Sequence, residues 1–195
     1  ERQEAVLKEL STEGVDGAIA SGGGRQVITM DRYEADWNMV KKGWAIHWKG
    51  EGPQFTSARA AIEKYRADNP AVIDQDLPPF VVARNGQPVG ALKKDDSVVI
   101  INFRGDRALE TCRAFEEENF TKFERGPKPE VMFAGMMEYD GDTHTPKNYL
   151  VTPPAIDRTM GEYVTGTGLN ILAISETQKY GHVTYFCNGN RDGRV

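Results

Sequence analysis

Hydrophobic positions along the chain alternate between two spacings, one typical of helices and one typical of strands. In residues 4–11, Val6, Leu7 and Leu10 recur at the spacing of one helical face. Short apolar runs rich in valine and isoleucine, which favour strands, lie between this helical segment and the helical segments that follow it in the sequence. Helices are predicted at residues 4–11, 36–42, 57–65 and 108–115, and strands at residues 18–21, 27–30, 80–83, 97–103 and 131–136. This alternation favours an α/β fold.

Residues 97–103 are apolar on both faces of the predicted strand. Such a run is typical of a central strand in a mainly parallel sheet that helices cover on both sides. Because residues 108–115 follow as a helix, the whole segment is a strand, a tight turn and a helix. Ligands bind beyond the carboxyl ends of strands in open α/β sheets, which is where Arg104 and Arg107 emerge.

Arg104 and Arg107 are therefore candidate anion-binding residues. Their spacing of three places both on one face of a first helical turn. There, each guanidinium fork can hold a carboxylate or phosphate through two hydrogen bonds. Gly105 keeps the turn tight, and Asp106 can cap the helix or orient a neighbouring arginine. The alternative is that both arginines pair with surface acids such as Glu110, and these residues alone leave both interpretations open.

A second pair of arginines lies around a run of three glycines. Residues 22–24 are glycines, which permit positive φ angles and a close approach of the backbone to another group. Arg25 and Arg32 flank the strand predicted at 27–30, and one small anion reaches both if that strand curves. The alternative is a glycine turn with two solvated arginines.

Residues 175–182 are a third candidate segment, because they follow a strand predicted at 170–174. Lys179 can neutralise a phosphoryl group during transfer. His182 can serve in acid–base chemistry, but a single histidine is more often structural, and we prefer that interpretation. The other histidines, His47 and His144, have no acidic or histidine partner at ligand spacing, so the sequence shows no metal site.

The composition is that of a folded protein without a nucleic-acid partner. The 195 residues are 39% hydrophobic and 27% charged, and the net charge is -5 at pH 7, whereas binding to duplexes needs a concentrated basic face. No apolar run is long enough to span a bilayer and the start lacks a signal-peptide pattern, so we expect no membrane partner. Cys112 and Cys187 lack metal or redox spacing and are expected to be buried thiols in a reducing compartment. Both ends of the chain look cut, which suggests a piece of a longer protein.

Six motifs, in the family's order, resemble the cofactor-independent phosphoglycerate mutases, most closely their plant and trypanosomatid branch. The likeness covers essentially all 195 residues. The motifs are SGGGR at 21–25, MDRY at 30–33, VIDQDLPP at 72–79, NFRGDR at 102–107, YLVTPP at 149–154 and SETQKYGH at 175–182.

The resemblance implies an α/β fold made of an inserted transferase domain and an alkaline-phosphatase-like domain. Residues 1–148 would be the C-terminal part of the substrate-binding transferase domain. Residues 149–154 would be an interdomain hinge, and residues 155–195 a segment of the phosphatase-like metal domain.

Members of this family interconvert 3-phosphoglycerate and 2-phosphoglycerate through a phosphoserine intermediate, with two divalent metal ions, manganese or magnesium. By motif match, Arg25, Arg32, Arg104 and Arg107 would bind the substrate, and Lys179 would be a catalytic lysine at the phosphoryl group. The family's nucleophilic serine and metal ligands lie upstream and downstream of these motifs. The resemblance therefore implies that this segment binds no metal and does not catalyse by itself. The expected protein is a cytoplasmic monomer with the two phosphoglycerates as its ligands.

Two other functions stay open on the sequence. One is a non-catalytic module that binds phosphate or carboxylate and has kept the arginines. The other is a different phosphomutase of the alkaline phosphatase superfamily, although such an enzyme would not be expected to carry the arginine-bearing inserted domain.

Overall fold

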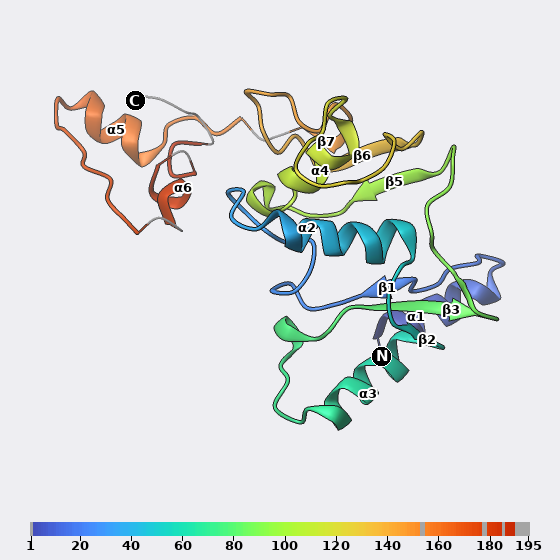
Figure 1. Cartoon of the computed structure of the whole chain (residues 1–195). Helices are drawn as coiled ribbons and strands as arrows, with labels where there is room; N and C mark the ends of the chain where they lie inside the picture. Colours follow the sequence, from blue (N-terminus) through green and yellow to red (C-terminus); the bar gives the residue numbers. More distant parts are fainter. Residues whose placement is uncertain (1, 153–154, 177–178, 185, 190–195) are drawn as a thin grey trace. The chain divides into compact units, whose positions relative to one another are not determined.

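The chain divides into two compact units, Glu1–Val151 and Thr152–Val195. The computed structural model describes residues 2–152, 155–176, 179–184 and 186–189. The first unit combines helices with two small sheets (Figure 1). The predicted α/β class is therefore confirmed.

Helices and strands alternate along much of the first unit. The helices are α1 (Arg2–Thr12), α2 (Trp37–Gly43), α3 (Ala58–Asp68) and α4 (Leu109–Glu116), with a π-helical segment at Trp44–Lys49 and 3₁₀ turns at Asp74–Asp76 and Gly105–Arg107. The strands are β1 (Ser21–Gly22), β2 (Gln54–Phe55), β3 (Phe80–Arg84), β4 (Gln87–Pro88), β5 (Ser97–Ile100), β6 (Met132–Met137) and β7 (Tyr149–Val151). The helices predicted from hydrophobic spacing in this unit are confirmed, with small shifts at their ends.

Two sheets of different character form the first unit. In one, the strand order is β1-β3-β2 and β4 also pairs with β3. β1 and β4 run antiparallel to β3, whereas β2 runs parallel to it. Asn85 and Gly86 join β3 to β4 with positive φ angles of 52° and 75°, which a tight two-residue hairpin turn requires. The other sheet, β5-β6-β7, is parallel throughout.

The helix formed by α2 and the following π-helical segment packs on both sheets. Trp44 is buried with Phe115 and Phe133, and the ring centroids of Trp44 and Phe115 lie 4.8 Å apart. Two residues further on, Ile46 is buried against Val81 of β3. Figure 1 shows this helix running between the sheet of β5, β6 and β7 and the strands β1 and β3. Because its opposite sides pack on different sheets, the helix joins them into one unit.

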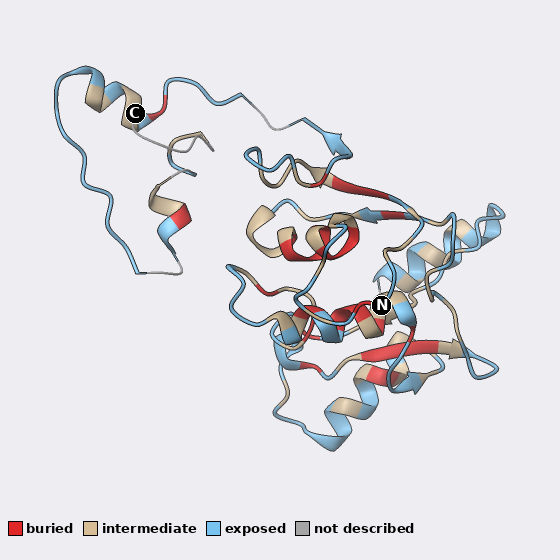
Figure 2. Ribbon diagram, turned by 45° about the horizontal axis from the view of Figure 1, so that its top comes forward, coloured by how far each residue is buried: buried red, intermediate tan, exposed pale blue. Residues whose placement is uncertain are grey.

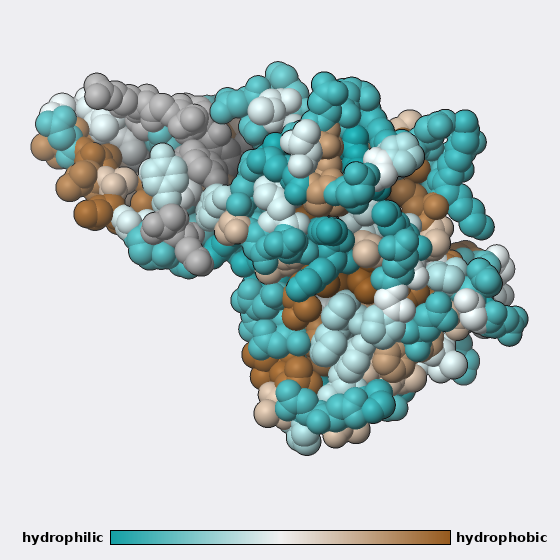
Figure 3. All heavy atoms as spheres, viewed as in Figure 1, coloured by the Kyte–Doolittle hydropathy of each residue, from teal (hydrophilic) through white to brown (hydrophobic). Residues whose placement is uncertain are grey.

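Helix α4 covers one face of the parallel sheet. Its buried residues include Cys112 and Phe115, which pack with Val98 of β5. Figure 2 shows the buried residues of the first unit in red, gathered on its central helices and strands. On the other face, Val99 and Met132 are 43% and 63% exposed. The prediction of a central strand covered on both faces is therefore wrong in the part of the chain that the structure describes, because β5 is the first of three strands and only alternate residues are buried. Figure 3 shows hydrophobic residues in separate patches on a mainly hydrophilic surface.

Residues 25–29 form turns and bends, so the strand predicted at 27–30 is wrong. The reason is local, since the Gly24 carbonyl accepts hydrogen bonds from the amides of Val27 and Ile28. Arg25 and Arg32 consequently flank a turn. The strand predicted at 18–21 shrinks to β1.

The second unit contains α5 (Met160–Gly166) and α6 (Tyr180–Val183). Thr159 and Glu162 form a reciprocal capping box at the start of α5. The strand predicted at 170–174 is wrong, because these residues have no regular structure, and Leu172 is 84% exposed. Across both units, the helices that the structure describes are too short or too polar to cross a membrane.

Candidate functional site

The three glycines at 22–24 let the chain pass close to its own backbone. A side chain at Gly24 would collide with the carbonyl group of Gln75 and would come within 2.7 Å of the nitrogen of Leu77. The Gly24 amide donates a hydrogen bond to the Leu77 carbonyl at 2.8 Å. The predicted close approach is confirmed, and its partner is the 75–77 segment. That contact positions Arg25, whose Nε donates to Gln75 Oε1 at 2.7 Å.

The turn after β5 is built around a buried carboxylate. Arg104 donates to Asp106 twice, from Nε to Oδ1 at 3.2 Å and from Nη2 to Oδ2 at 2.9 Å. The Asp106 side chain is 1% exposed and also lies 3.8 Å from Nη1 of Arg32. These bonds, together with the Asp106 charge, raise the pKa of Arg104 above its usual value. Asp106 thus orients Arg104, as expected, whereas the alternative partner Glu110 is buried and does not pair with it.

Arg107 reaches across to the loop that carries Arg32. Its Nη1 donates to the carbonyl of Met30. Asn102 approaches the same residue, with Nδ2 3.9 Å from the Met30 sulfur. The Nε of Arg107 is buried and has no hydrogen-bond partner among the residues that the structure describes. A buried donor without an acceptor costs free energy, so an acceptor placed at this N–H would be stabilising.

The four arginines form one electrostatic cluster. The pKa of Arg107 is lowered from its usual value, first by burial and then by the positive charges of Arg32 and Arg25. Arg104 lowers this pKa further, while Asp106 opposes the effect. Such interactions are strong only at short range. Asp106 lies between Arg104 and Arg32, the charges of Arg25, Arg32 and Arg104 all act on Arg107, and the buried Nε of Arg107 has no partner among the described residues. This chemistry suits a phosphate or a carboxylate.

Lys179 and His182, the other candidate residues, lie in the second unit. Lys179 is exposed and directly precedes α6. The His182 ring packs edge-on against Phe186 with 5.3 Å between centroids. Its Nδ1 is buried without a partner in the described part of the chain. The packing supports the structural interpretation of His182.

The remaining polar clusters in the described part of the chain do not form a metal centre. Among the residues that the structure describes, no three histidine, cysteine, aspartate or glutamate side chains are grouped to hold a metal ion. His47 Nδ1 lies 2.8 Å from the Ser21 hydroxyl, and burial lowers the pKa of this histidine. His144 Nδ1 lies 2.8 Å from Glu138. Each contact is a single pair.

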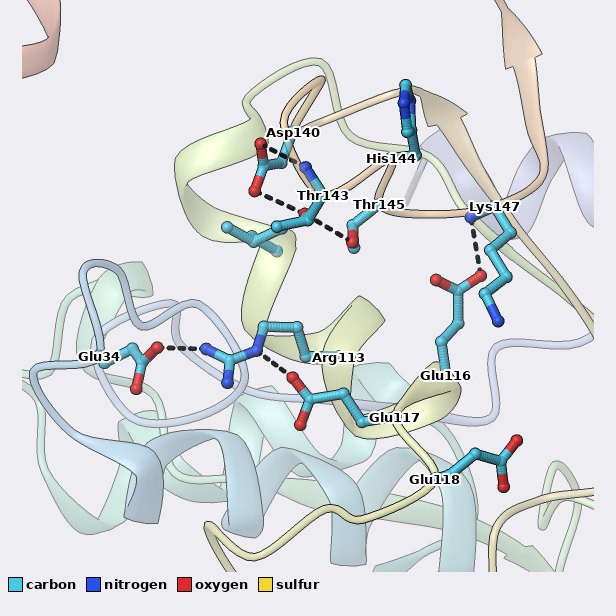
Figure 4. Close-up of a pocket in the computed structure, with 11 residues that line it drawn as sticks. Glu34, Arg113, Glu116, Glu117, Glu118, Asp140, Thr143, His144, Thr145 and Lys147 are labelled. Carbon is cyan, nitrogen blue, oxygen red and sulfur yellow. Dashed lines mark hydrogen bonds and ion pairs between the residues drawn. The ribbon is translucent and has the colours of Figure 1, made fainter.

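A pocket of about 600 Å³ opens beside α4, and none of the four candidate arginines lines it. Arg113 lies in it between Glu34 and Glu117 (Figure 4). Glu116 accepts a hydrogen bond from the amide of Lys147 at 2.9 Å. Because carboxylates predominate and Arg113 is already paired, this pocket suits an anion less well than the arginine cluster does.

Residues that support the arginines were missed at the level of sequence. Gln75 orients Arg25, and the Met30 carbonyl anchors Arg107, each across a long stretch of chain. Glu110 looked like a surface acid because it follows an arginine at helical spacing, but it is 4% exposed. The only available signal was that Gln75 and Met30 lie within the family-like motifs, which says nothing about their contacts.

Comparison with known proteins places this geometry in a family. The model of the BPG-independent phosphoglycerate mutase N-terminus matches residues 2–141. A probable 2,3-bisphosphoglycerate-independent phosphoglycerate mutase from Leptospira interrogans is 60% identical over 97% of this chain, and the enzyme of that name from Trypanosoma brucei brucei is 54% identical over 98%. A crystal structure of Leishmania mexicana phosphoglycerate mutase at low cobalt concentration is 52% identical, with a TM-score of 0.88 over 99% of this chain.

The chain spans about a third of these proteins, 35% in each case. The match to the family model includes all four arginines of the cluster, and the likeness extends to the three-dimensional structure. The chain therefore belongs to the BPG-independent phosphoglycerate mutase family.

Proposed function

We propose that the complete protein containing this chain interconverts 3-phosphoglycerate and 2-phosphoglycerate. In this proposal Arg25, Arg32, Arg104 and Arg107 bind the phosphate and the carboxylate of the substrate. The observation that carries it is the partly buried Arg107 side chain, whose buried Nε donor has no partner among the described residues and whose pKa is lowered by three further arginines. Phosphoglycerate bears two anionic groups, and guanidinium forks bind both kinds bidentately.

The arrangement favours binding of an anion that is already oriented for reaction. Asp106 holds Arg104 and lies beside Arg32 before any ligand arrives, so these side chains lose little freedom on binding. An anion between the arginines would relieve their mutual repulsion and give the Arg107 Nε an acceptor. Donors fixed in this way can also stabilise charge that develops on a transferring phosphoryl group.

The assignment of residues to domains is part of the same proposal. Residues 1–148 would belong to the substrate-binding transferase domain, 149–154 to the hinge and 155–195 to the phosphatase-like metal domain. Part of that hinge, residues 153–154, lies outside the described residues. Lys179 would contact the transferring phosphoryl group, an assignment that rests on its place in the family-like motif. This segment would not catalyse by itself.

We also propose that the complete enzyme uses two divalent ions, manganese or magnesium. Support comes from the Leishmania mexicana relative, whose crystal structure was determined at low cobalt concentration. The residues that the structure describes do not fit a metal centre, so no ligand is assigned to them. The setting proposed for the enzyme is glycolysis and gluconeogenesis in the cytoplasm, as a monomer.

The test is turnover by the complete protein, with 3-phosphoglycerate as substrate and enolase coupled to detect 2-phosphoglycerate. Activity should need no added 2,3-bisphosphoglycerate, should disappear after treatment with a chelator and should return with manganese or magnesium. Binding of 3-phosphoglycerate without turnover under all these conditions would instead support the non-catalytic module. Activity that survives complete metal removal would contradict the proposed metal dependence.

A further inference from the structure

A buried carboxyl group, Glu110, connects the two segments that carry the arginines. It lies on α4, three residues after Arg107, and is 4% exposed. Its Oε1 accepts a hydrogen bond from the amide of Glu34 at 3.1 Å, across 76 positions of sequence. Its Oε2 is buried and has no hydrogen-bond partner in the described part of the chain. The Glu110 carboxyl is thus a buried titratable group beside the candidate binding site.

The segment that Glu110 holds is the 30–36 loop, which is bent by backbone conformations that side chains disfavour. Tyr33 and Glu34 have positive φ angles of 61° and 56°. Two consecutive left-handed residues other than glycine cost free energy and persist only where the surroundings hold them. Within the loop, Asp31 Oδ2 accepts from the amide of Asp36 at 2.7 Å. The bond to Glu110 is donated by Glu34, the second of these two left-handed residues.

The same loop supplies two parts of the arginine cluster. The Met30 carbonyl anchors Arg107, and Arg32 lies beside Asp106. We propose that Glu110 is a positioning residue, which fixes the 30–36 loop against α4 and thereby places Arg32 and the Met30 carbonyl for anion binding. It does not touch the anion. It acts by holding one arginine-bearing segment against the other.

The charges around Glu110 show which protonation state can do this. Asp31 and Glu34 face it from the loop, and the Glu34 carboxylate, which forms ion pairs with Arg113 and Lys122, also raises the pKa of Glu110. Burial raises the pKa of Glu110 to about 7, against the lowering effect of the Glu34 amide, and the negative charge of Asp31 raises it further. A protonated Glu110 can accept from the Glu34 amide and keep its proton toward Asp31. An ionised Glu110 would repel Asp31 and loosen the loop as the pH rises through about 7.

The first experiment needs no ligand and uses the complete protein. Amide hydrogen exchange of the 30–36 loop, corrected for intrinsic rates, should be faster in Glu110→Ala by tenfold or more. At pH 6, where Glu110 of the wild type is still mostly protonated, exchange should be nearly unchanged in Glu110→Gln, because the amide keeps both a neutral acceptor and a donor. Glu116→Gln is the matched control, since this carboxyl lies on the same helix but contacts the Lys147 amide instead. Loop exchange in Glu110→Ala equal to that of the control would overturn the inference.

The second experiment tests the consequence for binding and rests on the proposed function. The dissociation constant of 3-phosphoglycerate is measured between pH 6 and 8.5. Relative to Glu110→Gln, the wild-type protein and Glu116→Gln should bind several-fold more weakly at the upper end. If the dissociation constant changes with pH in the same way in all three proteins, the inference that protonated Glu110 holds the loop is refuted. If none of them binds 3-phosphoglycerate, the proposed function fails, and the exchange experiment still decides the role of Glu110. If Glu110→Ala does not fold, the comparison of Glu110→Gln with wild type across pH remains decisive.

Discussion

At the scale of single residues, Asp106 determines what the arginine cluster can do. Its carboxylate accepts two hydrogen bonds from Arg104 and lies near Arg32, yet almost none of it reaches solvent. One negative charge thus fixes two positive side chains while leaving the cluster positive as a whole. Arg107 is anchored separately, through the Met30 carbonyl, and its buried Nε–H has no acceptor among the residues that the structure describes.

Arg107 should therefore be the most sensitive of the four arginines. We expect Arg107→Ala in the complete protein to lower kcat/KM for 3-phosphoglycerate on the order of 100-fold, because a partly buried donor set that the Met30 carbonyl orients is removed. Arg107→Lys should recover only part of this, since it keeps the charge but loses the planar fork. Steady-state kinetics would measure both effects.

Arg84→Ala serves as the control for charge, because Arg84 is exposed at the end of β3. It should leave the kinetics within about twofold of wild type, as expected for a surface substitution. An Arg107→Ala variant that keeps near-normal kcat/KM would show that the cluster is not where the substrate binds.

At the scale of elements, short segments are positioned by tight backbone contacts more than by regular structure. Two of the four arginines, Arg25 and Arg32, lie in the 21–32 segment, whose only regular element is the two-residue strand β1. Gly24 lets this segment lie directly on the 75–77 segment, and Gly105 lets the turn after β5 lie against the Tyr139 carbonyl, 2.9 Å from where a side chain would begin. Glycine is needed at both points because any side chain would collide with backbone.

Replacing Gly24 by alanine should therefore be damaging at both the structural and the binding level. The new methyl group would meet the Gln75 carbonyl, and the resulting shift should cost about 1–3 kcal/mol of stability. Because Arg25 follows directly and bonds to Gln75, affinity for 3-phosphoglycerate should also fall. Hydrogen exchange of the first unit and isothermal titration calorimetry would report the two effects.

Gly141→Ala is the matched control, since a side chain at that position meets nothing within 4 Å. Its stability and affinity should match those of wild type. Equal behaviour of the two alanine variants would mean that the 22–24 turn tolerates a shift and that close approach is not what selects glycine there.

Features set by residues close together in the sequence could be predicted from it, whereas features set by contacts between distant residues could not. Helix α4 and the tight turn before it were predicted, because hydrophobic spacing and Gly105 are local signals. The strand expected at 27–30 failed because a local apolar run cannot show that the Gly24 carbonyl closes a turn instead. The arginines were found by their type and motif. Their supports, such as Gln75 and Glu110, act across 50 and 76 positions and left no local signal.

At the scale of the whole molecule, the first unit is one cooperative body built from two sheets and the helix between them. Trp44 packs toward the parallel sheet and Ile46 toward the mixed one, so loss of the helix would expose both cores. The stability of the unit also depends on a buried titratable group, because Glu110 lies on the helix that covers the parallel sheet. The stability of the unit should consequently depend on pH.

The sign of that dependence follows from the pKa of Glu110. It is raised from 4.5 to about 7 in the folded chain, first by burial. The folded state then binds more protons than the unfolded state between these values, so stability falls as pH rises through that window. Because solvent screens part of the effect, the penalty above pH 7 is at most about 3 kcal/mol.

Glu110→Gln removes this penalty, since the amide cannot ionise. The variant should gain stability relative to wild type on going from pH 5 to pH 8, by at most about 3 kcal/mol. Exchange of the slowest α4 amides at the two pH values would measure it. Glu130→Gln, which alters an exposed pair with Lys94, should show no such change. A pH-independent difference between Glu110→Gln and wild type would contradict the assigned pKa.

The helix between the sheets also determines which part of the chain tryptophan fluorescence reports on. All three tryptophans of the chain, Trp37, Trp44 and Trp48, belong to it. Intrinsic tryptophan emission therefore reports on this helix and its neighbours. Thr152–Val195 contains no tryptophan, so a melting curve recorded by this emission follows the unfolding of the first unit. Trp37 directly follows the 30–36 loop, and its indole N–H donates to Glu34 at 3.1 Å. Its emission is thus a built-in optical probe of the segment that carries Arg32.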